Sequence, residues 1–549
     1  MTDSQHVSEY TQHLVEEVQN GRMTRRQLLV RASVIGLSAT TIGRLLAACG
    51  GTSTPSASPS ASATGAKAGG TMRVVMVPPT AAPNPVTMYD AGTIATVQQV
   101  CEYLAWVEND LSLRPVLAQS WSSDPAGKVW TFKLRAGVTF NNGKAFGADD
   151  VVATFKTLTN PKSGSAALSN FAGILGPAGI EKVDAQTVRF NLDRAFVDFP
   201  YLVASTNYNA VILPADYAGD FQKTPVGTGP FTLTGYVAGQ HATFKKNPTY
   251  WQKGLPYLDG VTFSYVSDVQ SQVLALQGGS VDMMLSTPFQ GSQALFSAPN
   301  VQIFSARSTQ FREVAMRVDK APFTDARVRQ AFAYCLNRPQ IIQALFQGKG
   351  DLGNDEIFAP IFPGAPALPQ RAQDYAKAKS LLAAAGHSGG LTVTLTVENY
   401  LEVPQYGTLF QQMCRPGGIT VNPNLETQTV YYGSGSTQPW LEVPMGITDW
   451  AARAVPSQFY LPMLTSKGVW NSSHWKDAQF DKLALQHDAT LDQATRTKIA
   501  TQMATIMQDQ TPVIITYWID SLRAATNKVG GVEANGSEFL DLTKATLSA

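Results

Sequence analysis

A glycine-rich segment at residues 386–390 contains the residue types of a hydrolase nucleophile. Its sequence, GHSGG, matches the G-x-S-x-G pattern in which a serine attacks an ester or amide. That serine needs a strand before it and a helix after it. Here an alanine-rich helical pattern precedes Ser388 and an alternating strand pattern follows it. Because the order is reversed, we interpret the segment as the glycine-rich end of a helix rather than a catalytic site.

The chain lacks the residue spacing that a phosphate-binding loop or a metal site would need. Residues 227–230 (GTGP) are rich in glycine but lack the lysine and hydroxyl of a phosphate-binding loop. The histidines have no second histidine or cysteine at metal-ligand spacing. The six are His6, His13, His241, His387, His474 and His487. The sequence therefore predicts no enzyme and no resident metal or cofactor, although a histidine-ligated metal complex stays open as a ligand.

Cys49 ends a segment with the layout of an export signal. Residues 24–26 (TRR) hold paired arginines, residues 32–43 are apolar, and residues 46–49 (LAAC) place small residues before the cysteine. This apolar stretch is too short to span a bilayer as a permanent helix. We predict a twin-arginine lipoprotein signal over residues 1–49, with cleavage before Cys49 and acylation of its thiol. The alternative is an ordinary amphipathic helix with a chance cysteine.

The rest of the chain has the composition of an exported soluble protein. Residues 50–70 have almost no apolar mass, which predicts a disordered tether. The remaining residues, about 480, are enough for two or three domains. With 42 basic and 41 acidic residues, the charge balance argues against a nucleic-acid partner. We expect the protein to act outside the cytoplasmic membrane, held near its surface by the lipid.

Strand and helix patterns alternate along this part, which indicates the α/β class. The expected strands are residues 72–77, 129–134, 138–140, 187–192, 391–397 and 511–517. The expected helices are residues 93–107, 148–158, 325–348, 374–385 and 493–508. Cys101 and Cys335 lie within apolar helical patterns and are interpreted as small core residues. Together with Cys414 they are neither an even nor a closely spaced set, so no disulfide framework is predicted, and their redox state stays open.

Several long motifs, in order, resemble the family 5 extracellular solute-binding proteins, the peptide/nickel-type receptors of ABC importers. The resemblance runs from about residue 69 to the C-terminus. The motifs are GGTMRVV, VCEYLAWVENDLSLRPVLAQSW, WTFKLRAGVTFNNGKAFGADDVVATFK, PVGTGPFTL, KKNPTYWQKGLPYLDGVTF, LALQGGSVDMM, APFTDARVRQAFAYCLNRPQII and YAKAKSLLAAAG.

The resemblance implies a large, two-lobed periplasmic-binding-protein fold of the cluster C type, with a small insertion domain and a hinge between lobes. Lobe I would comprise residues 71–120, 209–306 and 511–549, the insertion residues 121–208, and lobe II residues 307–510. A peptide or similar small solute would bind in the interlobe cleft and pass to ABC permease subunits with a cytoplasmic ATPase. The receptor would be a monomer.

The family's pocket loop would follow a buried strand at residues 445–447. In peptide-binding relatives this loop carries an aspartate for the peptide's amino group, and Ala452 stands at that position here. Arg453 offers a planar fork for a carboxylate or phosphate, or else an interlobe salt bridge. Trp450 could stack on a ligand or fill the core. The predicted ligand-binding residues are Tyr89, Asp90, Asn399, Tyr400, Tyr431 with its neighbour Tyr432, Asp449, Trp450 and Arg453.

Two alternatives to a peptide importer receptor stay open. A sensory receptor needs only the same binding and closure. A non-peptide solute, such as an anionic compound, a sugar or a metal complex, would explain why Ala452 replaces the acid.

Overall fold

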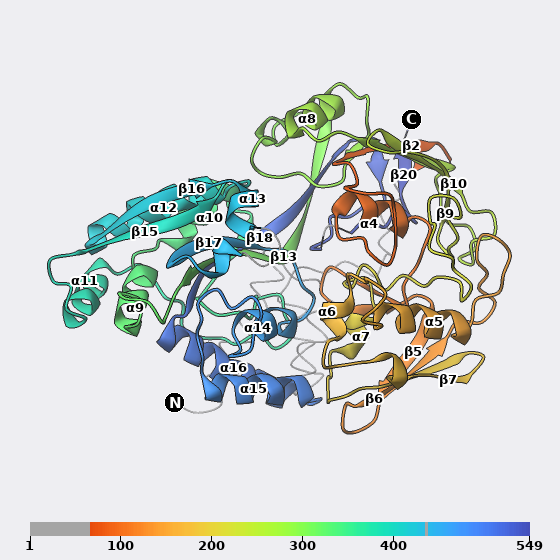
Figure 1. The fold of residues 1–549 in the computed structure, drawn as a ribbon. Coiled ribbons are helices and arrows are strands. Elements are labelled where there is room, and N and C mark those ends of the chain that lie inside the picture. The colour runs from red at the N-terminus through yellow and green to blue at the C-terminus, as the bar shows by residue number, and fades with distance from the viewer. Residues whose placement is uncertain (1–65, 68, 434–437, 538, 549) are drawn as a thin grey trace, which may run out of the picture. The chain divides into compact units, whose positions relative to one another are not determined.

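Two long strands, β13 (Val301–Met316) and β18 (Val513–Thr526), pair antiparallel along most of their length. In the computed structural model they lie side by side in the middle of the large sheet (Figure 1). Strand β17 (Met445–Trp450) pairs with the C-terminal half of β13, and β12 (Met283–Met284) pairs with the C-terminal end of β18. The two flanking groups of strands therefore attach to opposite ends of one β13–β18 ribbon.

The structure describes residues 66–67, 69–433, 438–537 and 539–548. The predicted signal with Cys49, and the predicted tether up to residue 65, lie outside this part. Residues Ala66–Lys67 form strand β1, which pairs with β20 (Thr546–Ser548), and β20 pairs with β19 (Val529–Gly530). Within the described residues, no helix combines the length and apolar character needed to cross a membrane.

One group of elements packs around the N-terminal strand of the large sheet. It comprises β2 (Thr71–Met76), α4 (Ala91–Gln98), β3 (Ala105–Val107), β4 (Leu113–Pro115), β9 (Phe231–Val237), β10 (His241–Lys246), β11 (Gly260–Tyr265), α8 (Val269–Gln277) and η2 (Gln293–Leu295). The sheet order at this end is β12-β2-β11-β10-β9. On one face of β2, the side chains of Met72, Val74 and Met76 are buried, as expected when alternate residues of a strand point to the same face.

A separate four-stranded sheet forms between β4 and β9, in the order β5-β6-β8-β7. Its elements are β5 (Ala118–Ser123), β6 (Val129–Leu134), α5 (Ala148–Leu158), α6 (Leu168–Phe171), η1 (Pro177–Gly179), β7 (Ile180–Asp184), β8 (Thr187–Asn191) and α7 (Phe199–Leu202). Phe132, Phe155, Phe190 and Phe199 meet edge to face or tilted inside it.

The other end of the large sheet has the order β16-β15-β17-β13-β18, with β14 beside β18. Its further elements are α9 (Ala326–Tyr334), α10 (Arg338–Phe346), β14 (Gly350–Leu352), α11 (Tyr375–Ala384), β15 (Leu391–Glu398), α12 (Val403–Cys414), η3 (Arg415–Gly417), β16 (Ile419–Glu426), α13 (Gln428–Tyr432), η4 (Pro439–Leu441), α14 (Ser457–Met463), α15 (Ala478–Ala489) and α16 (Gln493–Gln510).

This end of the sheet has a hydrophobic core on each face. Tyr517 and Trp518 are neighbours on β18 and belong to different cores because successive side chains point to opposite faces. One core includes Phe332 of α9 and Phe410 of α12. The other includes Phe459 of α14. The sheet is therefore buried on both sides where β13, β17 and β18 meet.

Charged side chains join the inserted sheet to helices α15 and α16. Arg194 lies 2.8 Å from the Asp488 carboxylate, and the Val197 N–H donates to the Asp488 carbonyl at 2.8 Å. Arg496 of α16 pairs with Asp198 at 2.6 Å. These contacts connect segments almost 300 residues apart in the chain.

Most predicted elements are present, with two corrections among the helices. The helix expected at residues 93–107 ends at Gln98, because residues 105–107 pair with β4 as strand β3. The helix expected at residues 325–348 is two helices, since Asn337 caps α10 with its side chain and Pro339 stands at the start of that helix. The expected strand at residues 138–140 is reduced to a single bridge between Thr139 and Ala145.

Candidate functional site

Polar side chains gather where β15 and β17 end. These two strands run parallel and pair through Thr396 with Gly446 and Val397 with Ile447. Their carboxyl ends, Glu398 and Asp449–Trp450, therefore lie at the same edge of the sheet. Ligands of open α/β sheets bind at this edge.

A pair of carboxylates forms the centre of this cluster. The Asp449 N–H donates to Glu398 Oε1 at 3.1 Å. The Tyr432 hydroxyl lies between the two side chains, 3.2 Å from Glu398 Oε1 and in hydrogen-bond contact with Asp449 Oδ1. Burial, with the nearby Asp449 charge, raises the pKa of Glu398 to about 8. The raised pKa favours a proton at this pair, which a bound cation could displace.

A buried ion pair lies next to these carboxylates. Arg312 of β13 stands opposite Asp449 in the β13–β17 register, and its Nε lies 2.7 Å from Glu402 Oε1. Both side chains are 3 % exposed. Glu402 is the ion-pair partner of Arg312, and the Arg312 charge also opposes the rise in the pKa of Glu398.

The structure separates the two neighbouring tyrosines. Tyr431 is buried, and its hydroxyl lies 2.9 Å from Thr448 Oγ1 in the protein interior. Tyr432 instead reaches the carboxylate pair. Asn399 is exposed and Tyr400 partly exposed, directly after Glu398. Glu398, Arg312 and Glu402 were missed as candidates, although Glu398 ends the predicted strand immediately before Asn399.

Trp450 belongs to the core. It is 5 % exposed, its ring lies parallel to Phe311 at a centroid distance of 6.0 Å, and its Nε1 donates to Glu313 at 2.6 Å. Burial raises the pKa of Glu313 to about 7, opposed by the bonds from Ser472 and Trp450. Trp450 and Asp449 are neighbours on β17 and face opposite sides of the sheet.

Replacing Trp450 with phenylalanine should lower the free energy of unfolding by about 1–3 kcal/mol, because buried Glu313 loses one of its two donors. Urea titration of this variant measures the loss. Trp470→Phe is the control, since Trp470 touches the Trp450 ring edge and is only partly buried. Unchanged unfolding together with lost ligand binding would contradict a core role for Trp450.

Arg453 lies in the loop after β17 and has no acidic partner among the described residues. Its N–H donates to Thr309 Oγ1 at 2.8 Å, and Thr309 Oγ1 donates to its carbonyl at 2.7 Å. The guanidinium donates to the Ala452 carbonyl at 3.0 Å. Burial lowers the pKa of Arg453, against a smaller influence of Tyr208. An arginine bonded only to neutral groups suits an anionic ligand.

Tyr89 and Asp90 lie apart from this cluster in their hydrogen bonding. Asp90 caps α4 and accepts the Thr93 N–H at 2.9 Å. Tyr89 is 66 % exposed, and Thr80 Oγ1 is its hydrogen-bond partner at 3.4 Å. The Asp90 carboxylate thus caps the N-terminus of α4.

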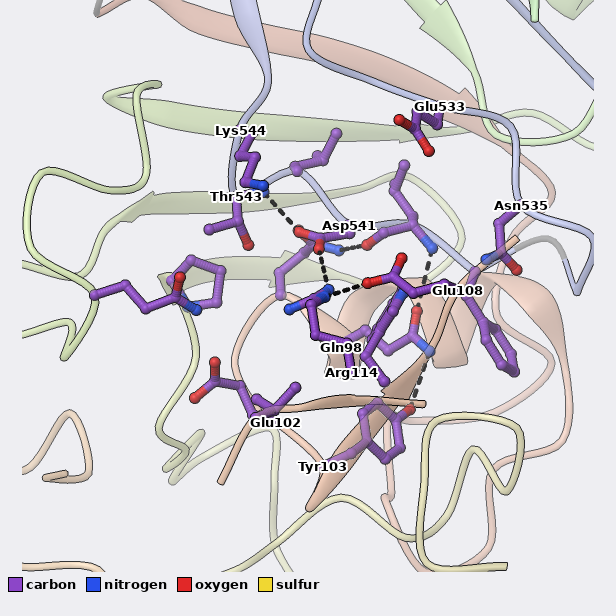
Figure 2. Close-up of a pocket in the computed structure, with 18 of the residues that line it drawn as sticks. Gln98, Glu102, Tyr103, Glu108, Arg114, Glu533, Asn535, Asp541, Thr543 and Lys544 are labelled. Atoms are coloured by element: carbon purple, nitrogen blue, oxygen red, sulfur yellow. Dashed lines mark hydrogen bonds and ion pairs between the residues drawn. The ribbon is translucent and has the colours of Figure 1, made fainter. Parts of the chain in front are cut away.

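A cavity of about 220 Å³ lies elsewhere, between residues 98–116 and 531–544 (Figure 2). Its charged groups bond to one another: Arg114 pairs with Glu108 and with Asp541. Buried Glu102 accepts bonds from Tyr250 and Trp251 at 2.8 Å each, and burial raises its pKa to about 7. The predicted ligand-binding residues do not line this cavity. The described residues also contain no cluster of metal-ligating side chains.

The long β13–β18 ribbon with a strand group at each end, and a polar cluster at strand ends, defines a two-lobed solute-binding protein of the α/β class. The family model for bacterial extracellular solute-binding proteins, family 5 (middle part), matches residues 112–472. The chain belongs to this family. As a member of this family, the chain is an extracellular solute-binding protein.

Curated relatives match at low identity over most of their length. Heme-binding protein A of Haemophilus influenzae is 27 % identical over 460 residues, covering 78 % of this chain and 82 % of the relative. Glutathione-binding protein GsiB of Escherichia coli is 26 % identical over 442 residues, covering 78 % and 85 %. The solved structure of HbpA2 from Haemophilus parasuis has a TM-score of 0.77 at 22 % identity, covering 87 % and 100 %.

Proposed function

We propose that the chain captures a small solute bearing both an amino group and an anionic group, such as a short peptide, for an ABC permease. The observation that carries this proposal is the Glu398–Tyr432–Asp449 cluster beside a loop whose Arg453 has no acidic partner among the described residues. A sensory receptor and a sugar or metal-complex binder are the alternatives.

The carboxylate pair would bind the amino group. A desolvated ammonium needs a carboxylate close by, and Ala452 supplies none at the position usual in peptide-binding relatives. Asp449 lies three residues earlier and is partly exposed. An ammonium beside Asp449 would displace the proton held at Glu398, so binding near pH 7 would release up to about one proton.

Arg453 would bind the anionic group. Its planar fork can donate two parallel bonds to a carboxylate or phosphate. The names of the two curated relatives agree with such a solute, because heme and glutathione both carry carboxylates and glutathione also carries an amino group.

The domain boundaries predicted above are part of this proposal. Lobe I comprises residues 71–120, 209–306 and 511–549, the insertion residues 121–208 and lobe II residues 307–510. The solute lies between the lobes, with Asn399, Tyr400 and Asp449 contributed by lobe II and Tyr89 by lobe I. A monomeric receptor would be anchored by a lipid on Cys49 after twin-arginine export.

A binding titration of the chain from residue 66 tests this function. Free di- to pentapeptides should raise the midpoint of thermal unfolding, and N-acetylated peptides should not, because only a ligand of the folded state stabilises it. Asp449→Asn should weaken peptide binding about 10- to 100-fold, which corresponds to one lost charged hydrogen bond. Arg453→Met should weaken the binding of peptides with a free C-terminal carboxylate more than the binding of amidated peptides.

The control variant is Asp541→Asn, which changes the lobe I cavity instead. If Asp541→Asn weakened peptide binding and Asp449→Asn did not, the ligand would lie in that cavity and the proposal would be overturned. Stabilisation by sugars alone would equally contradict it.

A further inference from the structure

Two cysteines meet where helices α9 and α12 end. Cys335 follows the last residue of α9, and Cys414 is the last residue of α12. Phe332 and Phe410 stack at a centroid distance of 6.0 Å with nearly parallel rings. Each cysteine lies about one turn beyond the phenylalanine of its own helix, so the ring contact continues as a contact between the two cysteines.

The two cysteines are buried next to each other. Cys335 Sγ donates to the Cys414 carbonyl oxygen at 3.9 Å, and burial together with the neighbouring Cys335 thiol raises the pKa of Cys414. Both side chains are 0 % exposed. A Cβ on Gly417 would come within 2.4 Å of Cys335 Sγ, so glycine at this position leaves room for the sulfur.

Cys101 offers a contrast within the same chain. It is equally buried, but its Sγ faces the Val226 carbonyl oxygen at 3.7 Å. Cys101 therefore contacts the backbone of a valine, whereas Cys335 contacts a second cysteine.

We propose that Cys335 and Cys414 are joined by an intramolecular disulfide once the chain is outside the cytoplasmic membrane. The family places the chain in a compartment where disulfides persist. This proposal rests on that location and not on the ligand.

The oxidant is a disulfide of a thiol–disulfide oxidoreductase or of a small thiol. One cysteine thiolate attacks a sulfur of that disulfide and forms a mixed disulfide. This first attack frees one sulfur of the oxidant as a thiolate. The other cysteine thiolate then attacks the sulfur of the first cysteine, which forms the Cys335–Cys414 bond and frees the second sulfur of the oxidant, so the oxidant leaves as a dithiol or as two thiols. The chain loses two hydrogens and the oxidant gains them.

Access to the buried sulfurs comes from the helix ends. Burial raises the pKa of the Cys414 thiol, so the packed pair is a poor nucleophile. Helix ends open most easily, and both cysteines lie at such ends. A chain exported in the folded state by its predicted twin-arginine signal would therefore be oxidised through local opening.

The bond would close a segment that carries part of the candidate site. The two cysteines are 79 residues apart. Helices α10 and α11, strand β15 and helix α12 lie between them, and so do Glu398 and Glu402. A cross-link over this distance restricts the unfolded chain and therefore stabilises lobe II.

Mapping of thiols in the full chain, recovered from the envelope of the expressing cells after acid quenching, tests the proposal. The chain is denatured and alkylated before and after reduction, then digested and weighed. We expect Cys101 to be alkylated at once, and Cys335 and Cys414 only after reduction. Their linked peptide should weigh about 2 Da less than the sum of its parts, from the two lost hydrogens.

Reduction should also lower the midpoint of thermal unfolding by roughly 5–10 °C. Cys335→Ala should abolish this difference and free Cys414, while Cys101→Ala should retain both the link and the difference. Immediate alkylation of all three cysteines in the exported wild-type chain would overturn the proposal. That result needs no variant, so a failure of Cys335→Ala to fold leaves the test intact.

Discussion

Replacing Arg312 with methionine should lower the free energy of unfolding by about 3–5 kcal/mol, the usual result of removing one member of a buried ion pair. Glu402 would be left buried without its guanidinium. Glu398 and Asp449 are close by, so the variant would gather carboxylates with no cation among them. Methionine keeps much of the buried volume, which separates the charge effect from a cavity effect.

Urea unfolding of the variant measures this loss, and its binding titration measures the effect on the site. Arg327→Met is the matched control, because Arg327 pairs with Asp325 on the surface and should change unfolding little. Equal unfolding midpoints for the two variants would refute the role assigned to Arg312.

Raising the pH from 6 to 9 should destabilise the protein by several kcal/mol, because buried carboxyl groups must ionise in the folded state. Burial raises the pKa of Glu102 and Glu313 to about 7, and that of Glu356 and Glu398 to about 8. In the unfolded chain these groups are already ionised at pH 6. The folded state therefore binds more protons across this window, and stability falls as the pH rises.

Glu356→Gln isolates one of these groups. Glu356 is buried beside Asp355, and the Phe358 N–H donates to it. In this variant, the fall in the free energy of unfolding between pH 6 and 9 should be smaller by about 2–3 kcal/mol, as expected for the removal of one group with a pKa near 8. Glu181→Gln, at a half-exposed position on β7, should leave the decrease unchanged. Urea midpoints measured at each pH provide the comparison, and a flat profile for the wild type would contradict it.

His487 affects the stability of the protein in a different pH range. Burial lowers its pKa to about 3, with a further contribution from Arg496. Its contribution to stability is lost as the pH falls below the unfolded value of about 6.5, towards 3. The decrease above pH 6.5 therefore comes from the carboxyl groups and not from this histidine.

Local patterns predicted several strands and helices, while the arrangement of the lobes came from the family resemblance. Strand β6 and helix α5 coincide with their predicted bounds, because alternation and a capped first turn are local signals. The β13–β18 ribbon joins residues 198 to 225 positions apart. Nothing near either strand in the sequence encodes that pairing, so local reasoning could not supply it.

The candidate site was predicted in part. Asp449 was chosen together with Trp450, although successive residues of a strand face opposite sides, so only one could join a given cluster. Tyr432, rather than Tyr431, reaches the carboxylates because a short helix, α13, fixes which of the two points there. Arg312 and Glu402 are far apart in sequence, and each alone resembles an ordinary surface charge.

The bonds between Thr309 and Arg453 link the loop that would hold an anion directly to the ribbon joining the lobes. Thr309 lies where β13 shifts register between Ala306 and Gln310, which is the part of the ribbon least constrained by its ladder. The N–H and the carbonyl of Arg453 both hydrogen-bond to Thr309, so the loop is tied to β13 at this register shift. If Arg453 holds the solute as proposed, a change in the angle between the lobes would reach the bound solute through this register shift in β13.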